Sequence, residues 1–199
     1  RTWTIEGTIL PKDTAAGWAN ALKLSYAADI DTLYAYGSRI SQDVENAFGD
    51  RPTSAIVCQS TDQGRTWTPS SEVPFPAECP LEVSHGILPL AHGRALAPAA
   101  TLPDKNRLGE EVVVAITDDH GQHWPRHAVA FRDPAGERAF FEHKFAALDD
   151  GRIIATAWTA SMGDYVDGPN HYALSSDQGE TWGPAVSTGI QGQTMTPIP

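Results

Sequence analysis

One eight-residue pattern occurs three times in this chain of 199 residues. Each copy reads Ser/Thr-x-Asp-x-Gly-x-x-Trp, and the Trp residues that close the copies are 57 and then 58 residues apart. A repeat at a fixed interval of this length is typical of proteins built from similar units placed side by side. The three copies span 60–67, 117–124 and 175–182.

Each residue type in the pattern suits a tight turn between two strands. The Asp carboxylate accepts backbone N–H bonds, the Gly adopts a positive φ, and the Ser or Thr adds a second local hydrogen bond. The Trp buries a large ring against the turn. We therefore assign a structural role, and not a catalytic one, to the Asp, Gly and Trp of each copy. They are Asp62, Gly64, Trp67, Asp119, Gly121, Trp124, Asp177, Gly179 and Trp182.

The segments around the turns predict four strands in each repeat. Short alternating or β-branched runs precede the turns at 54–59, 111–116 and 171–174. Earlier in two repeats lies a hairpin pattern whose turn glycines, Gly93 and Gly151, are 58 residues apart. No long helical period occurs. The sequence therefore predicts an all-β fold, a β-propeller with four-stranded antiparallel blades.

The repeat length sets the expected number of blades. At about one blade per 57 residues the chain holds roughly three and a half, in repeats spanning 5–75, 76–133 and 134–190, with the next beginning at 191–199. Residues 1–4 repeat residues 65–68, which indicates the tail of a fourth turn. We expect one propeller domain over 1–199 that is incomplete at both ends, with its remaining blades outside this chain.

The repeated turn resembles the Asp box, or BNR repeat, of sialidases (neuraminidases), whose fold is a six-bladed propeller. Similar boxes occur in sortilin-type receptors, some endoglucanases and non-catalytic propellers. The resemblance implies that the boxes join the third and fourth strands on one face. Ligands are then expected on the opposite face, where first strands begin and second strands end.

The resemblance also implies a catalytic position. Sialidases carry a Glu at the start of a first strand, which assists a Tyr nucleophile, and an Arg at the end of the second strand, which binds the substrate carboxylate. Glu142 matches the Glu, but the place of the Arg holds Trp158. The nucleophile, the general acid and the other Arg positions are implied outside the chain. An indole suits stacking on a neutral sugar ring, with packing between blades as the alternative.

Glu142 precedes the Gly151 turn by nine residues, and Trp158 follows it by seven. The two arms of this hairpin are nearly equal, so we predict that both residues lie at the same rim of the propeller. His85 and His143 occupy equivalent positions in adjacent repeats, which indicates either two imidazoles facing one pocket or a packing habit of the repeat. The remaining candidates for binding substrate at this rim are Arg39, Tyr165 and Asn170.

The composition limits the partners. A formal charge of −11 repels phosphate backbones, so no nucleic-acid partner is expected. Apolar runs are too short to insert into a membrane. No metal-ligand spacing stands out, because His120, His123 and His127 lie beside a box turn, and no cofactor is expected. The two cysteines do not form a disulfide framework.

Two functions fit these observations. The first is a sialidase-like glycoside hydrolase, an exo-glycosidase acting on terminal sugars of glycans, with sialidase activity itself in doubt because of Trp158. The second is a non-catalytic Asp-box propeller that binds a glycan or a protein. The expected partner is a carbohydrate or glycoconjugate, with a protein as the other possible partner in the second case, and a secreted or periplasmic location is favoured.

Overall fold

The computed structural model describes residues 7–10, 17–42, 52–193 and 195–198. All regular structure in these ranges is β, and none of it is helical, which confirms the predicted all-β class. The strands form three antiparallel sheets that follow one another in sequence order. The partial repeat at 1–4 lies outside the described residues.

The first sheet has the order β1-β2-β3-β4. The turn that joins its first two strands places Asp31 at a φ of 46°. Gly37 lies where these strands approach closely, because a Cβ there would be 1.8 Å from the carbonyl oxygen of Ala21. The strands are β1 (Trp18–Ala27), β2 (Thr32–Ser41), β3 (Thr53–Ser60) and β4 (Ser71–Glu72).

The middle sheet has an interrupted first strand. Its two pieces, β5 and β6, both pair with β7, on either side of Pro98, a residue that has no N–H to donate to a neighbouring strand. Residues 83–87 between the two pieces leave the ladder. The strands are β5 (Leu81–Glu82), β6 (Leu88–Pro89), β7 (Ala95–Thr101), β8 (Glu111–Thr117) and β9 (Arg126–Arg132).

The third sheet keeps a continuous first strand that carries a bulge. Phe141 pairs with Trp158 and Lys144 pairs with Thr156, so two residues of the first strand stand opposite one residue of the second. The sheet order is β10-β11-β12-β13. Its strands are β10 (Arg138–Ala147), β11 (Ile153–Ser161), β12 (Asp167–Ser175) and β13 (Val186–Gln191).

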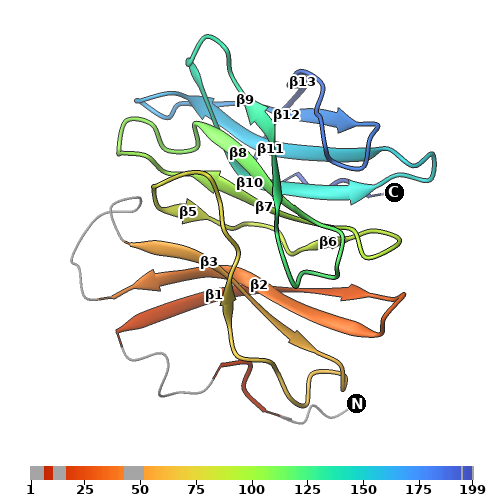
Figure 1. Ribbon diagram of the computed structural model, residues 1–199. Helices are drawn as coiled ribbons and strands as arrows, with labels where there is room; N and C mark the ends of the chain where they lie inside the picture. Colours follow the sequence, from red (N-terminus) through yellow and green to blue (C-terminus); the bar gives the residue numbers. More distant parts are fainter. Residues whose placement is uncertain (1–6, 11–16, 43–51, 194, 199) are drawn as a thin grey trace, which may run out of the picture.

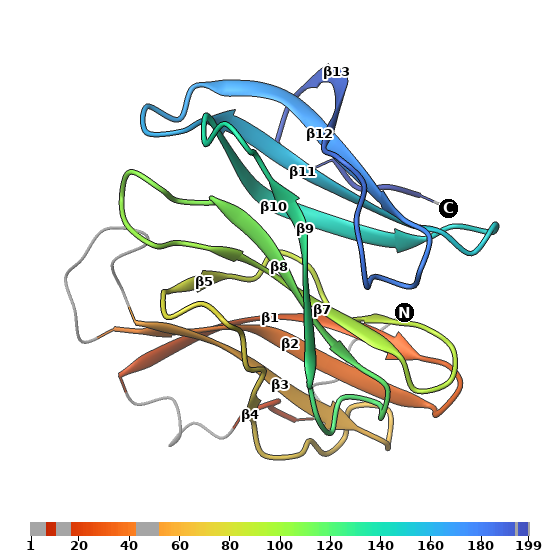
Figure 2. The same ribbon diagram turned by 45° about the horizontal axis from the view of Figure 1, so that its top comes forward.

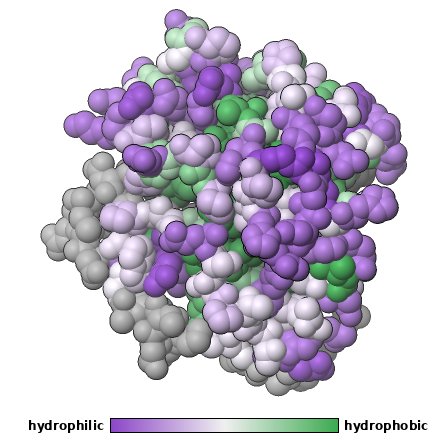
Figure 3. Space-filling model, viewed as in Figure 1, coloured by the Kyte–Doolittle hydropathy of each residue, from purple (hydrophilic) through white to green (hydrophobic). Residues whose placement is uncertain are grey.

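The middle sheet is buried on both faces, because the other two sheets pack against it (Figures 1 and 2). Alternate residues of β7 enter different apolar layers: Ala97 and Ala99 face the first sheet, and Leu96 and Ala100 face the third. This explains why β7 and β8 read as almost unbroken apolar runs. Hydrophilic residues dominate the surface drawn in Figure 3, in keeping with the negative charge.

The first strands of the three sheets line a common hollow of about 650 Å³. On β1 two large apolar side chains remain exposed at its wall, Leu24 at 60% and Tyr26 at 52%. The hollow therefore lies where the central channel of a closed ring of sheets would be.

The three repeated turns at 60–67, 117–124 and 175–182, the box turns, share one hydrogen-bond pattern. The Ser or Thr hydroxyl accepts the Gly N–H at 2.8, 3.1 and 2.9 Å in successive copies. Asp Oδ1 accepts the N–H of the residue four positions later at 2.8, 2.9 and 2.9 Å. In the first copy, bonds from Thr66 to the carboxylate lower the pKa of Asp62 to about 2. Each turn joins the third strand of its sheet to the fourth.

Candidate functional site

Glu142 lies in the bulge of β10, at a φ of 44°. A positive φ is costly for a residue with a side chain, and such strain is found where the surrounding structure imposes it. The bulge directs Glu142 into a pocket at the end of the strands opposite the box turns, and it directs the next residue, His143, into the interior, where it is fully buried.

Trp158 forms part of an aromatic wall in the same pocket. Its ring lies 5.3 Å from that of Phe141, and Phe141 lies 6.0 Å from Tyr165. The indole Nε1 donates to Asp167 Oδ1 at 3.1 Å, which fixes the orientation of the ring. The Tyr165 hydroxyl accepts the N–H of Leu108 at 2.8 Å and donates to a carbonyl of the same loop at 3.0 Å.

The structure therefore brings together Glu142 and Trp158, as the hairpin geometry predicts, and adds Tyr165 from the loop that follows β11. The pocket has a volume of about 240 Å³. Among the described residues that line it there is no Arg, Lys or His, and the ionisable carboxyl groups are those of two Glu residues. The described residues of the lining are Glu82, Leu108, Phe141, Glu142, Trp158 and Tyr165.

The two predicted histidines do not face this pocket. His143 is packed edge-on against Phe145 and is buried, and neither of its ring nitrogens has a hydrogen-bond partner. Burial lowers the pKa of His143 to about 3 and that of His85 to about 4. His85 stacks on the same phenylalanine and lines the large hollow instead. Of the two interpretations of these histidines, a pocket shared by two imidazoles or packing that recurs with the repeat, His143 fits the second.

Arg39 and Asn170 also lie outside the pocket lining. Arg39 is placed over the ring of Trp18 at 4.9 Å, in the first sheet. Asn170 is buried in β12, and its amide donates to the carbonyl of Gly192 at 2.6 Å. That bond connects β12 to the chain after β13, which is a structural use of the side chain.

Two lysines from the outer sheets converge on the interruption in the middle sheet. Lys23 Nζ, from β1, donates to the carbonyl of Val83 at 2.5 Å, and Lys144 Nζ, from β10, donates to that of Ser84 at 2.5 Å. These carbonyls have left the ladder, so the lysines satisfy acceptors that would otherwise be unpaired. Burial lowers the pKa of both lysines.

Sequence reasoning places Glu82 at the start of a first strand, among the positions expected to face a ligand, but gives it no catalytic or binding role. The structure puts it beside Glu142, although the two residues belong to different sheets. A signal existed in the sequence, because Glu82 and Glu142 stand 60 residues apart, close to the repeat length. Phe141 and Leu108 are also in the lining and carry no pattern that distinguishes them from core residues.

The arrangement combines an aromatic wall with paired carboxylates in a concave site. Aromatic faces bind the apolar faces of sugar rings, and carboxylates act as proton donors and acceptors. Among the residues that the structure describes, no group of three or more metal-ligating side chains is found. In the same part of the chain, no helix is long and apolar enough to span a membrane.

Solved structures similar to this chain include several carbohydrate-processing enzymes. A protein of unknown function from Dyadobacter fermentans aligns with a TM-score of 0.70 and 21% identity, covering 88% of this chain and 52% of its own. The intramolecular trans-sialidase from Ruminococcus gnavus aligns at 0.55 and 22%, covering 87% and 35%. A GH43 β-1,3-galactosidase aligns at 0.56 and 15%, covering 89% and 33%.

At these identities the likeness concerns the fold, which is shared with sialidases and other propeller-type glycosidases. The chain spans about half the length of the first of these proteins and about a third of the other two. No family model matches the sequence. A sequence search of curated proteins likewise finds no match.

Proposed function

We propose that this chain belongs to an Asp-box β-propeller of the sialidase kind, six-bladed when whole, and that it hydrolyses terminal sugars of glycans. The observation that carries the proposal is that Glu142 and Trp158 line one pocket. The three repeated turns and the three antiparallel sheets, two of four strands and one whose first strand is in two pieces, support the propeller. The remaining blades would cover the exposed apolar side chains of β1.

The pocket favours a neutral sugar over sialic acid. A sialic acid carboxylate needs cationic donors, usually Arg, and none is found among the described residues that line this pocket. Trp158 occupies the place where the sialidase pattern has an Arg, and its N–H is already bonded to Asp167. It therefore offers a flat ring face, on which the apolar face of a sugar stacks.

Glu142 is the catalytic group in this proposal, acting on the bond to the terminal sugar. Replacing Glu142 with Gln keeps the side-chain shape but removes the ability to exchange a proton. We expect the kcat of Glu142→Gln to fall by about 10²–10⁴-fold on neutral aryl glycosides. KM is expected to change little, because the variant keeps the pocket walls.

Replacing Trp158 with Ala removes the stacking surface. We expect KM to rise by about tenfold with a smaller change in kcat, and Trp158→Phe to recover most of the binding. Glu137→Gln serves as a control, since Glu137 is exposed at the start of the same region and does not line the pocket.

A panel of neutral and anionic aryl glycosides tests the catalytic role of Glu142 and the preference for a neutral sugar together. Normal activity of Glu142→Gln on every glycoside that the parent cleaves would show that Glu142 is not catalytic. Hydrolysis of sialosides in preference to neutral glycosides would overturn the substrate class. If the parent binds glycans without cleaving any, the chain is the binding propeller, and Trp158→Ala should then weaken that binding.

A further inference from the structure

The pocket contains a second carboxylate that comes from a neighbouring sheet. Glu82 is the last residue of β5 and pairs with Ala100 in the middle sheet, whereas Glu142 lies in β10 of the third sheet. Both line the same pocket. The break in the first strand of the middle sheet follows directly after Glu82, so this carboxylate stands at the edge of an irregular segment.

The nearby lysines do not neutralise this pair. Lys23 and Lys144 donate to the backbone carbonyls of Val83 and Ser84. Within the described part of the chain, no ion pair joins either lysine to Glu82 or Glu142. The positive charges are thus held in fixed places around the carboxylates and are not bonded to them.

The environment of Glu82 is unusual for a carboxylate. The Ser84 hydroxyl donates to Oε1, while Oε2 is enclosed and has no hydrogen-bond partner. Burial raises the pKa of Glu82, and the negative charge of Glu142 raises it further, against the opposing effects of the Ser84 hydroxyl, the charge of Lys23 and the backbone N–H of Glu142. A carboxyl in such a place keeps its proton more readily than one in water.

We propose that Glu82 is the proton donor of the reaction at this site and that Glu142 works beside it as the carboxylate. The assignment rests on the glycosidase function proposed above. Glu82 is mostly buried, and its Oε2 has no hydrogen-bond partner among the described residues. A bound glycoside would supply that partner in its glycosidic oxygen.

The step balances with water as the second reactant. The bond between the anomeric carbon and the glycosidic oxygen breaks, and its electron pair stays on the oxygen, which takes the proton of Glu82. The Glu142 carboxylate stabilises the positive charge on the anomeric carbon. A water molecule then adds to that carbon and gives up a proton, which restores the carboxyl of Glu82 directly or through Glu142. Two carboxyl groups held in different environments serve this chemistry in most glycosidases. The sialidase pattern uses a Tyr nucleophile instead, so the assignment of Glu82 and Glu142 departs from that pattern.

The assignment predicts that Glu82 matters only where the leaving group needs a proton. We expect Glu82→Gln to lose at least about 10²-fold in kcat/KM on alkyl glycosides. On 2,4-dinitrophenyl glycosides of the same sugar, whose leaving group departs as an anion, the variant should stay within about fivefold of the parent. The alkaline limb of the parent's pH profile on alkyl glycosides should disappear in the variant.

Glu142→Gln provides the comparison, because it should lose activity on both substrate classes. Glu137→Gln should be unchanged on both. Glu82→Asp, which keeps the acid on a shorter side chain, should recover part of the activity on alkyl glycosides, and thermal unfolding of each variant shows that the fold is retained.

Three results would overturn the assignment. An equal loss of Glu82→Gln on both substrates, with Glu142→Gln inactive, would leave the glycosidase function standing and make Glu82 structural. An unchanged alkaline limb in Glu82→Gln would also exclude it as the proton donor. A parent that cleaves no glycoside of either class would remove the glycosidase function and this assignment with it.

Discussion

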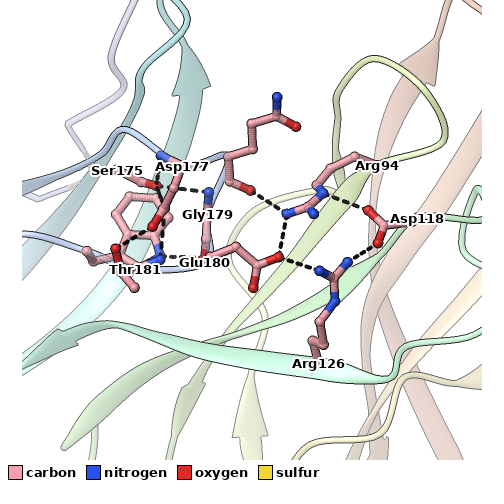
Figure 4. Close-up of polar contacts among 10 residues, drawn as sticks. Arg94, Asp118, Arg126, Ser175, Asp177, Gly179, Glu180 and Thr181 are labelled. Carbon is pink, nitrogen blue, oxygen red and sulfur yellow. Dashed lines mark hydrogen bonds and ion pairs between the residues drawn. The ribbon is translucent and has the colours of Figure 1, made fainter.

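Charged side chains are paired differently at the two ends of the strands. At the box-turn end, two arginines and two acids form a closed network between the middle and third sheets (Figure 4). Arg94 binds Asp118 at 2.7 Å and Glu180 at 2.9 Å. Arg126 binds the same two acids, Glu180 at 2.5 Å. Every charge in this network has partners of the opposite sign.

At the pocket end, Glu82 and Glu142 share a site with each other, and the nearby lysines bind backbone carbonyls. Two histidines behind them are held in their neutral form. One end of the molecule therefore satisfies its polar groups internally, while the other keeps several that are incompletely satisfied. Groups of the second kind are concentrated where proteins bind ligands and carry out chemistry.

Of the effects compared between the two ends of the strands, the largest expected on stability comes from a glycine at the box-turn end. Gly93 has a φ of 81°, and a Cβ there would be 2.6 Å from the carbonyl oxygen of Asp118. We expect Gly93→Ala to lower the free energy of unfolding by about 3–4 kcal/mol, from backbone strain and overlap together. Urea unfolding measures the change.

Gly151 is the matched control, since it occupies the equivalent turn of the third sheet with a φ of 85°. Nothing lies within 4 Å of a Cβ at Gly151. Gly151→Ala should therefore cost only the strain of a positive φ, about 1–2 kcal/mol. Equal costs for the two variants would show that the contact with Asp118 contributes nothing.

The second expected effect is a loss of stability in mild acid that originates at the pocket end. In the folded state the pKa of His143 is lowered to about 3, so its ring stays neutral in mild acid. In the unfolded chain the same ring becomes protonated below about pH 6.5. The unfolded state then binds more protons, so stability falls as the pH falls from 6.5 toward 3, by about 1.4 kcal/mol per pH unit. His85 adds a smaller loss of the same sign, because it is partly exposed.

Chemical denaturation at pH 7, 6 and 5 tests this, with His143→Gln as the comparison. The raised pKa of Glu82 acts with the opposite sign, so the quantity to follow is the difference between parent and variant. That difference should change by about 2 kcal/mol between pH 6.5 and 5. The box-turn aspartates, whose pKa values are lowered, should affect stability only as the pH falls below about 4. If the free energies of unfolding of the parent and of His143→Gln change equally with pH, the prediction is contradicted.

The smallest effect concerns the ion network itself. The Arg94 side chain is 14% exposed and bridges two acids from different sheets. Arg94→Gln should lower the free energy of unfolding by about 1 kcal/mol, because Asp118 and Glu180 would then share one cation. Thermal unfolding at low and high salt should show the difference shrinking as salt screens the charges.

Arg107 offers the matched case, since it also bridges two acids, Asp104 and Glu110, but is 54% exposed and lies within one loop. Arg107→Gln should change stability by less than about 0.5 kcal/mol. A loss as large as that of Arg94→Gln would mean that linking the sheets adds nothing to the pairing.

Local patterns predicted the parts of the fold that local chemistry controls. The box turns form because the Ser or Thr, Asp and Gly of each copy bond to one another within five residues, so tertiary context is not needed to recognise them. The hairpin around Gly151 was predictable for the same reason, and with it the meeting of Glu142 and Trp158. The bulge at Glu142 was not predicted, since nothing in its neighbours requires an extra residue.

Equivalent positions in a repeat did not imply equivalent roles. His85 and His143 are 58 residues apart in the sequence, yet one lines the large hollow and the other is enclosed in the core. The cause is the first strand, which is broken in the middle sheet and continuous in the third. Asn170 was predicted at the site from its place after a second strand, but its amide is used to hold the chain beyond β13.

The repeat, the turns that divide it, the antiparallel strands and the candidate pair Glu142 and Trp158 were predictable from sequence, because each of these depends on residues within one repeat. Which repeats meet, and which side chains they bring together, depends on the tertiary structure. Glu82 and Glu142 share a pocket because two sheets pack side by side, and the lysines reach the broken strand from both of its neighbours. Contacts between sheets depend on packing over long sequence separations, and no local pattern of residues records them.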